Sequence, residues 1–279
     1  MKKRPKFIAV TLQKGGLGKS AVTVNLAANL CMKKRSKYSK YYNRVLIIDG
    51  DVHATASHYL GVYNEQDKGL YDVLTGKCSF DTAIKEYSFE YGTPYVKPFR
   101  IDILPSFTFL ATIETNWLTY NEPSMLLRKA IEKSEKIMEY DYVLIDCPPE
   151  GNCLLSNIYN VCDYYIMPVL PDSESNKNLG ITYEQIGVLS SIKKDNKYLG
   201  VVINNYQKSD GADFHVEEFQ NNPYIHCFDT IIPHSKDYDN SLLGHMPIPL
   251  FRKKTNRCIR LNLAFKAFTN EFITEINKE

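Results

Sequence analysis

The chain has 279 residues, of which 44% are hydrophobic and 24% charged, close to the usage of ordinary globular proteins. The net charge of +2 is too small for nucleic-acid binding through the field of the whole protein, so such binding would need local basic patches. Seven cysteines without C-x-x-C spacing indicate reduced thiols in the cytoplasm and argue against a disulfide framework or a zinc site. No apolar run approaches the length of a membrane span.

Short apolar runs alternate with segments of helical periodicity along the whole chain. The runs predict strands at 6–12, 44–49, 101–105, 142–146, 163–169, 198–204 and 227–232. The predicted helices are 20–34, 69–86, 123–139, 178–193, 213–220 and 258–276. This alternation is typical of βαβ units, so we expect an α/β fold with a doubly wound, mostly parallel sheet flanked by helices. Because we find no repeat and no linker, we expect residues 1–279 to form one domain.

A glycine-rich turn, TLQKGGLGKSAVT, joins the first strand to the first helix. Its end fits the phosphate-loop pattern G-x-x-x-x-G-K-[ST], but Gln13 stands where the first glycine is expected. In such a loop the glycines let backbone N–H groups point at an anion, the lysine reaches the β- and γ-phosphates and the hydroxyl binds Mg²⁺. The nucleotide-binding residues predicted in this way are Gly15, Gly16, Leu17, Gly18, Lys19, Ser20 and Ala21, with Ser20 also a metal ligand.

Acidic residues follow two of the predicted strands. Asp146 ends YDYVLID, at the strand edge where ligands of open α/β sheets gather, and is the second predicted ligand of the Mg²⁺ site. Asp49 and Asp51 follow RVLII and are two residues apart, so their like charges lie on one side of an extended chain. An acid here could position a water for attack on the γ-phosphate. Without the other motifs, a solvated turn would be the favoured explanation of this pair.

These residues together resemble the ParA/MinD family of deviant Walker ATPases, which are P-loop NTPases, and most closely its ParA (Soj-like) branch. The stretches that carry the resemblance appear in family order: QKGGLGKSAVTVNLAANL, RVLIIDGD, LYDVLTGKCSFDTAI, IDILPS, YDYVLIDCPPEGNCLLSN, CDYYIMPVLPDSESNKNLGI, LGVVIN and FDTIIPHS. The resemblance implies ATP and Mg²⁺ as cofactors and a slow, Mg²⁺-dependent ATPase activity. It also implies a nucleotide-sandwich homodimer, in which the signature lysine, here Lys14, reaches the phosphates of the partner's ATP.

The resemblance assigns further roles by position. Asp51 would orient the attacking water, with Asp49 beside it, and Asn204 would read the adenine. Pro233 and His234 lie where the family packs the base. The chain departs from the family pattern at Val52 and His53, where the family has Pro-Gln.

Two basic segments bear on DNA binding. Residues 33–44 carry six basic side chains, no acid and three tyrosines; this expanded connection is either a solvated surface or a second contact. The segment 251–260 opens the last helix, and we expect sequence-independent, salt-sensitive phosphate contacts from Arg252, Lys253, Lys254, Arg257 and Arg260. Since little chain precedes residue 6, we expect no N-terminal helix-turn-helix domain.

The function implied by the resemblance is segregation of a plasmid or chromosome by a cytoplasmic, nucleoid-associated ATPase. A ParB-like centromere-binding protein would stimulate its hydrolysis. One alternative is a MinD-like positioning ATPase on a membrane or polar cargo, although acids in 258–276 disfavour a membrane anchor. Another is an iron–sulfur carrier of related fold, for which Cys147, Cys153 and Cys162 lack the usual spacing.

Overall fold

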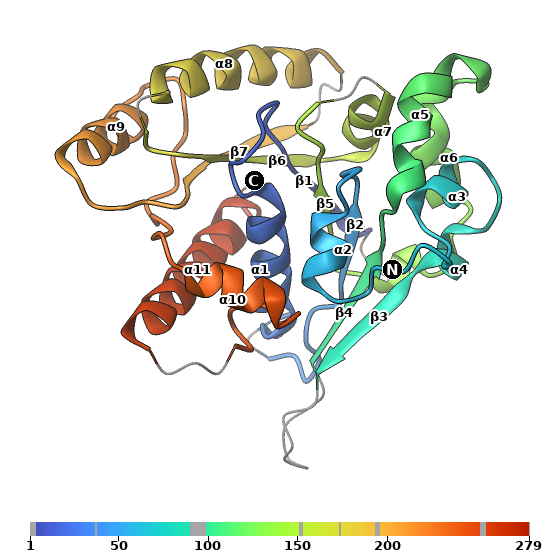
Figure 1. The fold of residues 1–279 in the computed structure, drawn as a ribbon, viewed down its shortest axis with the longest axis horizontal. Helices are drawn as coiled ribbons and strands as arrows, with labels where there is room; N and C mark the ends of the chain where they lie inside the picture. The colour runs from blue at the N-terminus through green and yellow to red at the C-terminus, as the bar shows by residue number, and fades with distance from the viewer. Residues whose placement is uncertain are drawn as a thin grey trace.

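The structure is a computed structural model that describes residues 4–36, 38–89, 99–150, 153–172, 174–192, 196–251 and 255–278. Its centre is a seven-stranded sheet in the order β3-β4-β2-β5-β1-β6-β7 (Figure 1). The strands are β1 (Lys6–Val10), β2 (Val45–Asp49), β3 (Lys85–Phe89), β4 (Phe99–Leu104), β5 (Tyr142–Asp146), β6 (Tyr164–Val169) and β7 (Lys197–Ile203). All pairings are parallel except β3 with β4. The expected doubly wound, mostly parallel α/β sheet is therefore confirmed.

Helices cover both faces of the sheet, which explains why its central strands are almost entirely apolar. They are α1 (Lys19–Cys31), α2 (Thr55–Tyr59), α3 (Leu70–Leu74), α4 (Phe80–Ala83), α5 (Ala111–Asn116), α6 (Leu126–Glu132), α7 (Cys153–Val161), α8 (Ser175–Ile192), α9 (Asp210–Gln220), α10 (Asp237–Leu243) and α11 (Asn256–Glu275). Figure 1 shows α8 on one side of β6 and β7, with α1 and α11 together on the other. One buried cluster joins α1 and α11 to the sheet, and a second joins α3, α6 and α7 to the opposite face.

Register in the parallel sheet places the functional acids side by side. Val10 at the end of β1 is opposite Asp146 at the end of β5, and Asp146 is opposite Asp49 at the end of β2. The carboxyl ends of these three central strands therefore meet at one edge, where the turn after β1 also begins. Ligands of open α/β sheets bind at this edge.

The prediction of a single helix over 69–86 was wrong. Residue Gly76 adopts φ +72 just after α3, a conformation that ends a helix and that glycine takes without strain. The Ser79 hydroxyl then accepts a hydrogen bond from the Thr82 N–H and starts α4. Residues 85–89 form the antiparallel edge strand β3, in which partly buried and exposed side chains alternate.

The predicted strand 227–232 was also wrong, although the segment does run alongside β7. Phe228 and Ile232 each donate a backbone hydrogen bond to β7, to Val201 and Ile203. Between them Thr230 turns away, because its N–H and hydroxyl donate to the Glu271 carboxylate of α11. A side chain from a distant helix thus replaces the strand pairing that the apolar pattern indicated.

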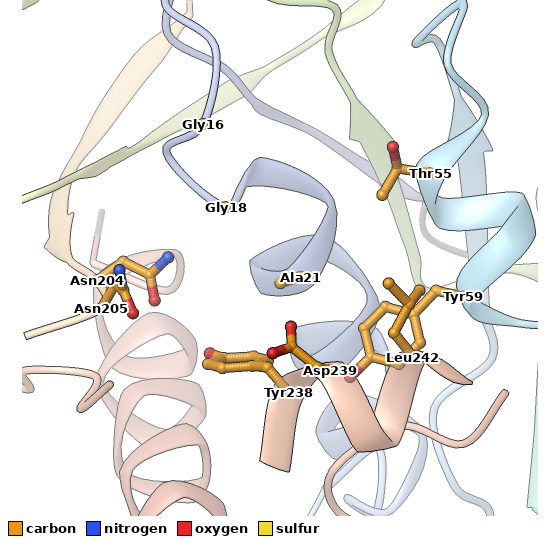
Figure 2. Close-up of a pocket in the computed structure, with 10 residues that line it drawn as sticks. All are labelled: Gly16, Gly18, Ala21, Thr55, Tyr59, Asn204, Asn205, Tyr238, Asp239 and Leu242. Atoms are coloured by element: carbon orange, nitrogen blue, oxygen red, sulfur yellow. The ribbon is translucent and has the colours of Figure 1, made fainter. Parts of the chain in front are cut away.

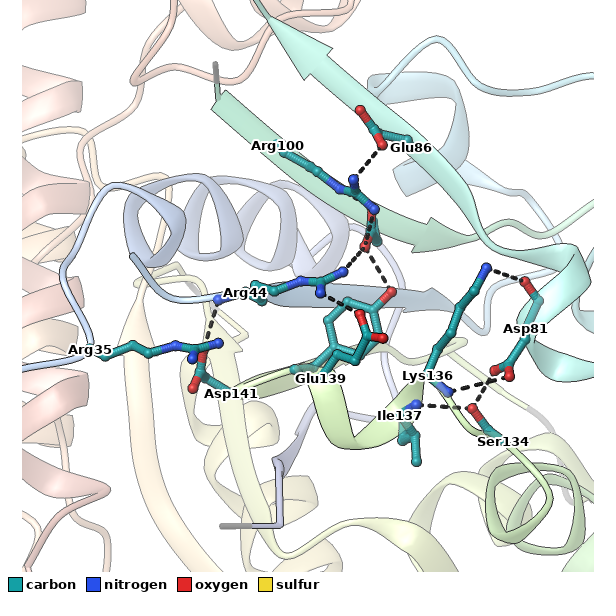
Figure 3. Close-up of polar contacts among 12 residues, drawn as sticks. Arg35, Arg44, Asp81, Glu86, Arg100, Ser134, Lys136, Ile137, Glu139 and Asp141 are labelled. Carbon is teal, nitrogen blue, oxygen red and sulfur yellow. Dashed lines mark hydrogen bonds and ion pairs between the residues drawn. The ribbon is translucent and has the colours of Figure 1, made fainter. Parts of the chain in front are cut away.

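The basic connection 33–44 folds as a small hairpin at the sheet edge opposite the acids. Lys34 pairs with Tyr42 in an antiparallel bridge. Figure 3 shows that Arg35 is paired with Asp141, and Arg44 with Glu139. Two of the six basic side chains therefore neutralise acids of the same protein and hold the hairpin on the fold.

A buried carboxylate on β4 organises a wider polar network. Asp102 is 2% exposed and accepts hydrogen bonds from Arg100 Nε at 2.8 Å and from the Tyr140 hydroxyl at 2.7 Å. Arg44 lies 3.5 Å away, and Arg100 also pairs with Glu86 of β3 (Figure 3). Because a buried carboxylate is costly unless it is paired, this network fixes β4 and the edge strand β3 against the rest of the sheet.

Candidate nucleotide site

The glycine-rich turn forms a loop whose shape depends on two left-handed residues. Gly16 and Gly18 have φ of +77 and +80, values that only glycine adopts without strain. A Cβ on Gly18 would lie 2.3 Å from Asn204 Nδ2, so glycine is also required there for packing. Gly18 precedes α1 without a side-chain cap, which leaves the first N–H groups of this helix available to an anion.

Lys19 lies folded back onto this loop. Its ammonium group donates to the carbonyl oxygens of Leu12 at 3.1 Å and Lys14 at 2.7 Å, and the residue is only 6% exposed. Burial lowers the pKa of Lys19, while the Asp146 carboxylate opposes that shift. The ammonium group is therefore held by carbonyl dipoles at the centre of the loop.

The first half of the loop is attached to α8 and the residue before it. The Gln13 N–H donates to the Gln185 side chain at 3.0 Å. Lys14 forms an ion pair with Glu174 at 2.5 Å, in which Glu174 is half-exposed. Lys14 therefore has a partner within its own chain and lies at the surface, at 23% side-chain exposure.

Asp146 is the acid that faces the loop without hydrogen-bond partners. It is fully buried, and neither of its carboxylate oxygens forms a hydrogen bond among the described residues. Burial and the neighbouring Asp49 charge raise the pKa of Asp146 well above its ordinary value, and the positive charge of Lys19 opposes the rise. Buried polar atoms in native proteins are almost always paired, so two unpaired carboxylate oxygens fit a site for a hard cation.

Asp49, in contrast, has a complete set of partners. One oxygen accepts from the Ser57 N–H at 2.8 Å and the Ser57 hydroxyl at 2.7 Å, and the other accepts from the Asp51 N–H. Burial raises the pKa of Asp49 to about 6, against the opposing hydrogen bonds from Ser57. The structure therefore places Asp49 as the group that positions α2 and Asp51.

Asp51 lies just beyond β2 and is held by the residue that departs from the family pattern. One of its oxygens accepts from the His53 N–H at 3.0 Å and contacts His53 Nδ1 at 2.9 Å. The imidazole itself is largely exposed. His53 is thus the side chain beside this carboxylate.

A pocket of about 200 Å³ adjoins the loop (Figure 2). It is lined by Gly16, Gly18, Ala21, Thr55, Tyr59, Asn204, Asn205, Tyr238, Asp239 and Leu242. Asn204, which follows the last residue of β7, is one of them. Pro233 and His234 are not among the lining residues, although His234 Nδ1 contacts the Asn205 side chain at 2.8 Å.

Sequence reasoning missed the residues of α2 and α10 that line this pocket. The helix α10 has only seven residues, too few for a clear helical period. Two local signals were present: the Ser235 hydroxyl accepts from the Asp237 N–H at the helix start, and Gly244 follows its end.

The proposed DNA residues are only partly described. Arg252, Lys253 and Lys254 lie outside the described residues. Arg257 and Arg260 are exposed in the first turns of α11, and neither forms an ion pair in the part of the chain that the structure describes.

The cysteines and the helices bear on the two alternative functions, an iron–sulfur carrier and a membrane-bound ATPase. All seven cysteines are free, and in the described ranges no three His, Cys, Asp or Glu side chains gather as metal ligands. A cation beside Asp146 would therefore take the rest of its shell from water, a hydroxyl or a bound ligand. No helix in the described part of the chain is long and apolar enough to span a membrane.

The profile of a protein family described as an AAA domain matches residues 5–199, which is more than half of the chain. The chain belongs to this family. The chain is a P-loop ATPase of the ParA type, and it is similar to the sporulation initiation inhibitor protein Soj of Bacillus subtilis, 31% identical over 165 residues. That match covers 59% of this chain and 58% of Soj.

Two solved structures share the AAA-domain fold. Cobyrinic acid a,c-diamide synthase of Mycobacterium smegmatis, with an ATP analogue and magnesium, superimposes with a TM-score of 0.77 at 20% identity, covering 98% of this chain and 96% of that one. A plasmid partition protein of Borrelia burgdorferi bound to AMPPNP gives 0.73 at 18% identity, covering 97% and 99%. The chain spans between 55% and 62% of the length of several curated relatives that it matches.

Proposed function

We propose that this protein is an ATP- and Mg²⁺-dependent partition ATPase that segregates plasmid or chromosomal DNA. The observation that carries the proposal is the pairing of a phosphate loop with an unpartnered, buried Asp146 beside it. The relatives named Soj and plasmid partition protein support the biological role.

The residues present fit the nucleotide and the metal. Backbone N–H groups between Gly15 and Ser20 would bind the phosphates, with Lys19 released from its carbonyl partners to the β- and γ-oxygens. The Ser20 hydroxyl and Asp146 would hold the Mg²⁺ site. The metal would supply positive charge that offsets the negative charge of the phosphates.

Hydrolysis would depend on Asp51. Its carboxylate would accept a hydrogen bond from the attacking water and fix its direction toward the γ-phosphate. Asp49 supports this arrangement by holding the Asp51 N–H and the start of α2. The contact with His53 orients one Asp51 oxygen and leaves the other available to the water.

Dimerisation would engage Lys14. Its partner Glu174 is half-exposed, and ion pairs at the surface contribute little to stability. A nucleotide phosphate presented by a second copy would therefore compete well for this ammonium group. A dimer held in this way would form with ATP and separate after hydrolysis, when a ParB-like partner stimulates turnover.

The test uses one preparation for two measurements. Light scattering gives the molar mass with and without nucleotide, and a separate assay gives the rate of phosphate release. With AMPPNP and Mg²⁺ the wild type should run as a dimer, and Lys14→Ala should bind nucleotide but stay monomeric. Lys278→Ala, which removes an exposed lysine paired with Glu275 far from the loop, is the matched control. A Lys14→Ala protein that dimerises like the wild type would contradict the sandwich.

A further inference from the structure

Among the described residues, five buried side-chain atoms lack a hydrogen-bond partner: Ser106 Oγ, both carboxylate oxygens of Asp146, Asn204 Oδ1 and the Tyr238 hydroxyl. The Asp146 oxygens are explained by the cation site. Asn204 and Tyr238 belong to one pocket, the one that adjoins the phosphate loop. Two unpaired polar atoms in a single pocket are unusual in a folded protein and indicate a ligand that completes them.

The orientation of Asn204 is fixed by the loop. Its amide nitrogen donates to the Leu17 carbonyl oxygen at 2.9 Å, and the residue is 3% exposed. The amide oxygen is therefore the Asn204 side-chain atom that has no hydrogen-bond partner among the described residues, and it can only accept a hydrogen bond. A ligand group beside it must be a donor.

Tyr238 comes from α10, on the other side of the pocket. Its ring packs edge-on against Phe265 of α11, with the centroids 5.9 Å apart. Figure 2 shows the hydroxyl end of the ring directed toward Asn204 and Asn205, below the first turn of α1. A tyrosine hydroxyl can donate or accept, and here no protein group in the described residues does either with it.

We infer that Tyr238 is a base-reading residue, which together with Asn204 selects a 6-aminopurine. The 6-amino group of adenine would donate to Asn204 Oδ1, and a ring nitrogen next to that group would accept from the Tyr238 hydroxyl. Guanine presents a carbonyl oxygen where adenine has the amino group, and Asn204 Oδ1 cannot donate to it. This inference rests on the proposed nucleotide function and adds the determinant of base choice.

The inference is tested with Tyr238→Phe, which removes the hydroxyl and keeps the ring on Phe265. Calorimetry of AMPPNP binding with Mg²⁺ should show affinity weakened about 5- to 20-fold, the loss of one buried hydrogen bond. Tyr206→Phe is the matched control, because Tyr206 is close in sequence to Asn204 but its hydroxyl bonds Asp213 outside the pocket. The control should bind AMPPNP as the wild type does.

Base analogues identify the contacts. Wild-type protein should bind purine riboside triphosphate, which lacks the 6-amino group, at least about tenfold more weakly than ATP, because Asn204 Oδ1 then stays buried and unpaired. The analogues 1-deaza-ATP and 7-deaza-ATP each lack one of the ring nitrogens next to the 6-amino group. The one that lacks the nitrogen bonded by Tyr238 should bind the wild type more weakly than ATP does, by about the same factor as Tyr238→Phe weakens AMPPNP binding. For that analogue the substitution should cause no additional loss. Full affinity for both deaza analogues would overturn the role of Tyr238.

Thermal melting without nucleotide separates base recognition from a structural role. Because the hydroxyl has no partner among the residues that the structure describes, Tyr238→Phe should melt no lower than the wild type. A lower melting temperature with unchanged AMPPNP affinity would assign the hydroxyl to the fold and overturn the inference. Wild-type protein that binds no triphosphate would instead contradict the proposed function, whereas equal binding of ATP and GTP would contradict only the base selection.

Discussion

Gly18 is limited both by its backbone conformation and by a neighbour. Its φ is +80, and an added Cβ would meet Asn204 Nδ2 at 2.3 Å. We therefore expect Gly18→Ala to lower the free energy of unfolding by about 1–3 kcal/mol and to abolish nucleotide binding. Urea unfolding and calorimetry check both effects. Gly187→Ala in α8, where a Cβ would meet nothing within 4 Å, is the control and should be neutral or stabilising.

Asp146 and Asp49 give the free protein a pH-dependent stability. Burial raises the pKa of both acids, that of Asp49 to about 6, so the folded state binds protons more tightly than the unfolded chain. Stability should then fall as the pH rises from about 4, the unfolded value, through 6 and above. Asp146→Asn removes one charge at constant shape, so it should be more stable than the wild type by about 1–3 kcal/mol at pH 8.

Urea unfolding without nucleotide or Mg²⁺, from pH 4.5 to pH 8, measures this difference. The difference in unfolding free energy between the variant and the wild type should become smaller toward pH 4.5, where the wild-type carboxyl groups are already neutral in the folded protein. In the same variant, Mg²⁺ should no longer increase nucleotide affinity. Equal stability of the two proteins at pH 8 would show that Asp146 does not bear an unfavourable buried charge.

At the scale of elements, α2 connects the acids to the nucleoside pocket. Ser57 bonds Asp49 through its N–H and hydroxyl, and its hydroxyl oxygen also accepts from the Ser106 N–H at 3.1 Å. At the other end of α2, Tyr59 lines the pocket and its hydroxyl lies 2.6 Å from Ser241 of α10. A change at Asp51 or in the base pocket would therefore be transmitted through one five-residue helix.

Ser57→Ala tests the attachment of α2. It leaves the buried Asp49 carboxylate short of one donor and the Ser106 N–H without an acceptor, so we expect a loss of about 2–4 kcal/mol of unfolding free energy. Hydrogen exchange should quicken in α2 before other helices. The control is Ser106→Ala: in the described part of the chain the Ser106 hydroxyl is buried without a partner, so its removal should cost almost nothing. Similar losses for both serines would contradict this account.

At the scale of the whole molecule, α11 separates the two basic segments. Lys33 of the hairpin donates to Asn270 near the end of this helix, whereas Arg257 and Arg260 lie in its first turns. Asn270 lies 10 residues after Arg260 and 13 after Arg257, which is about 15–20 Å along the helix, so the segments form two surfaces and not one. The end that carries Arg257 and Arg260 is the end near α10 and the nucleotide pocket.

We therefore expect DNA binding to depend on the arginines of α11. The double change Arg257→Glu and Arg260→Glu should weaken ATP-dependent binding of unrelated duplexes at least about tenfold and flatten its salt dependence by about two charges. Lys34→Glu with Lys40→Glu, the same charge change on the hairpin, should have little effect. Gel shift and fluorescence anisotropy at several salt concentrations measure the DNA affinity of both double variants. A larger loss of affinity for the hairpin variant would contradict this prediction and assign DNA binding to residues 33–44.

Sequence patterns located most of the fold because its central strands are continuous apolar runs and its long helices have a clear period. They also located Lys19, Ser20, Asp49, Asp51 and Asp146, since a parallel sheet brings the ends of its central strands to one edge. The same patterns missed α7, whose first N–H groups are capped by Glu114, a residue 39 or 40 positions earlier in the chain. A cap supplied from so far away leaves no local signal.

By itself, then, the sequence determined the doubly wound sheet and the phosphate loop, because both follow from local backbone geometry and from periodic burial. The tertiary structure alone decided which polar atoms are left without partners. Both Asp49 oxygens are bonded, one by Ser57 of α2 and the other by the Asp51 N–H, whereas the Asp146 oxygens have no partner among the described residues. Asn204 and Tyr238 meet in one pocket although 34 positions separate them. Hydrogen-bond pairing depends on which groups the folded chain brings within about 3 Å of each other, and no pattern along the sequence encodes that distance.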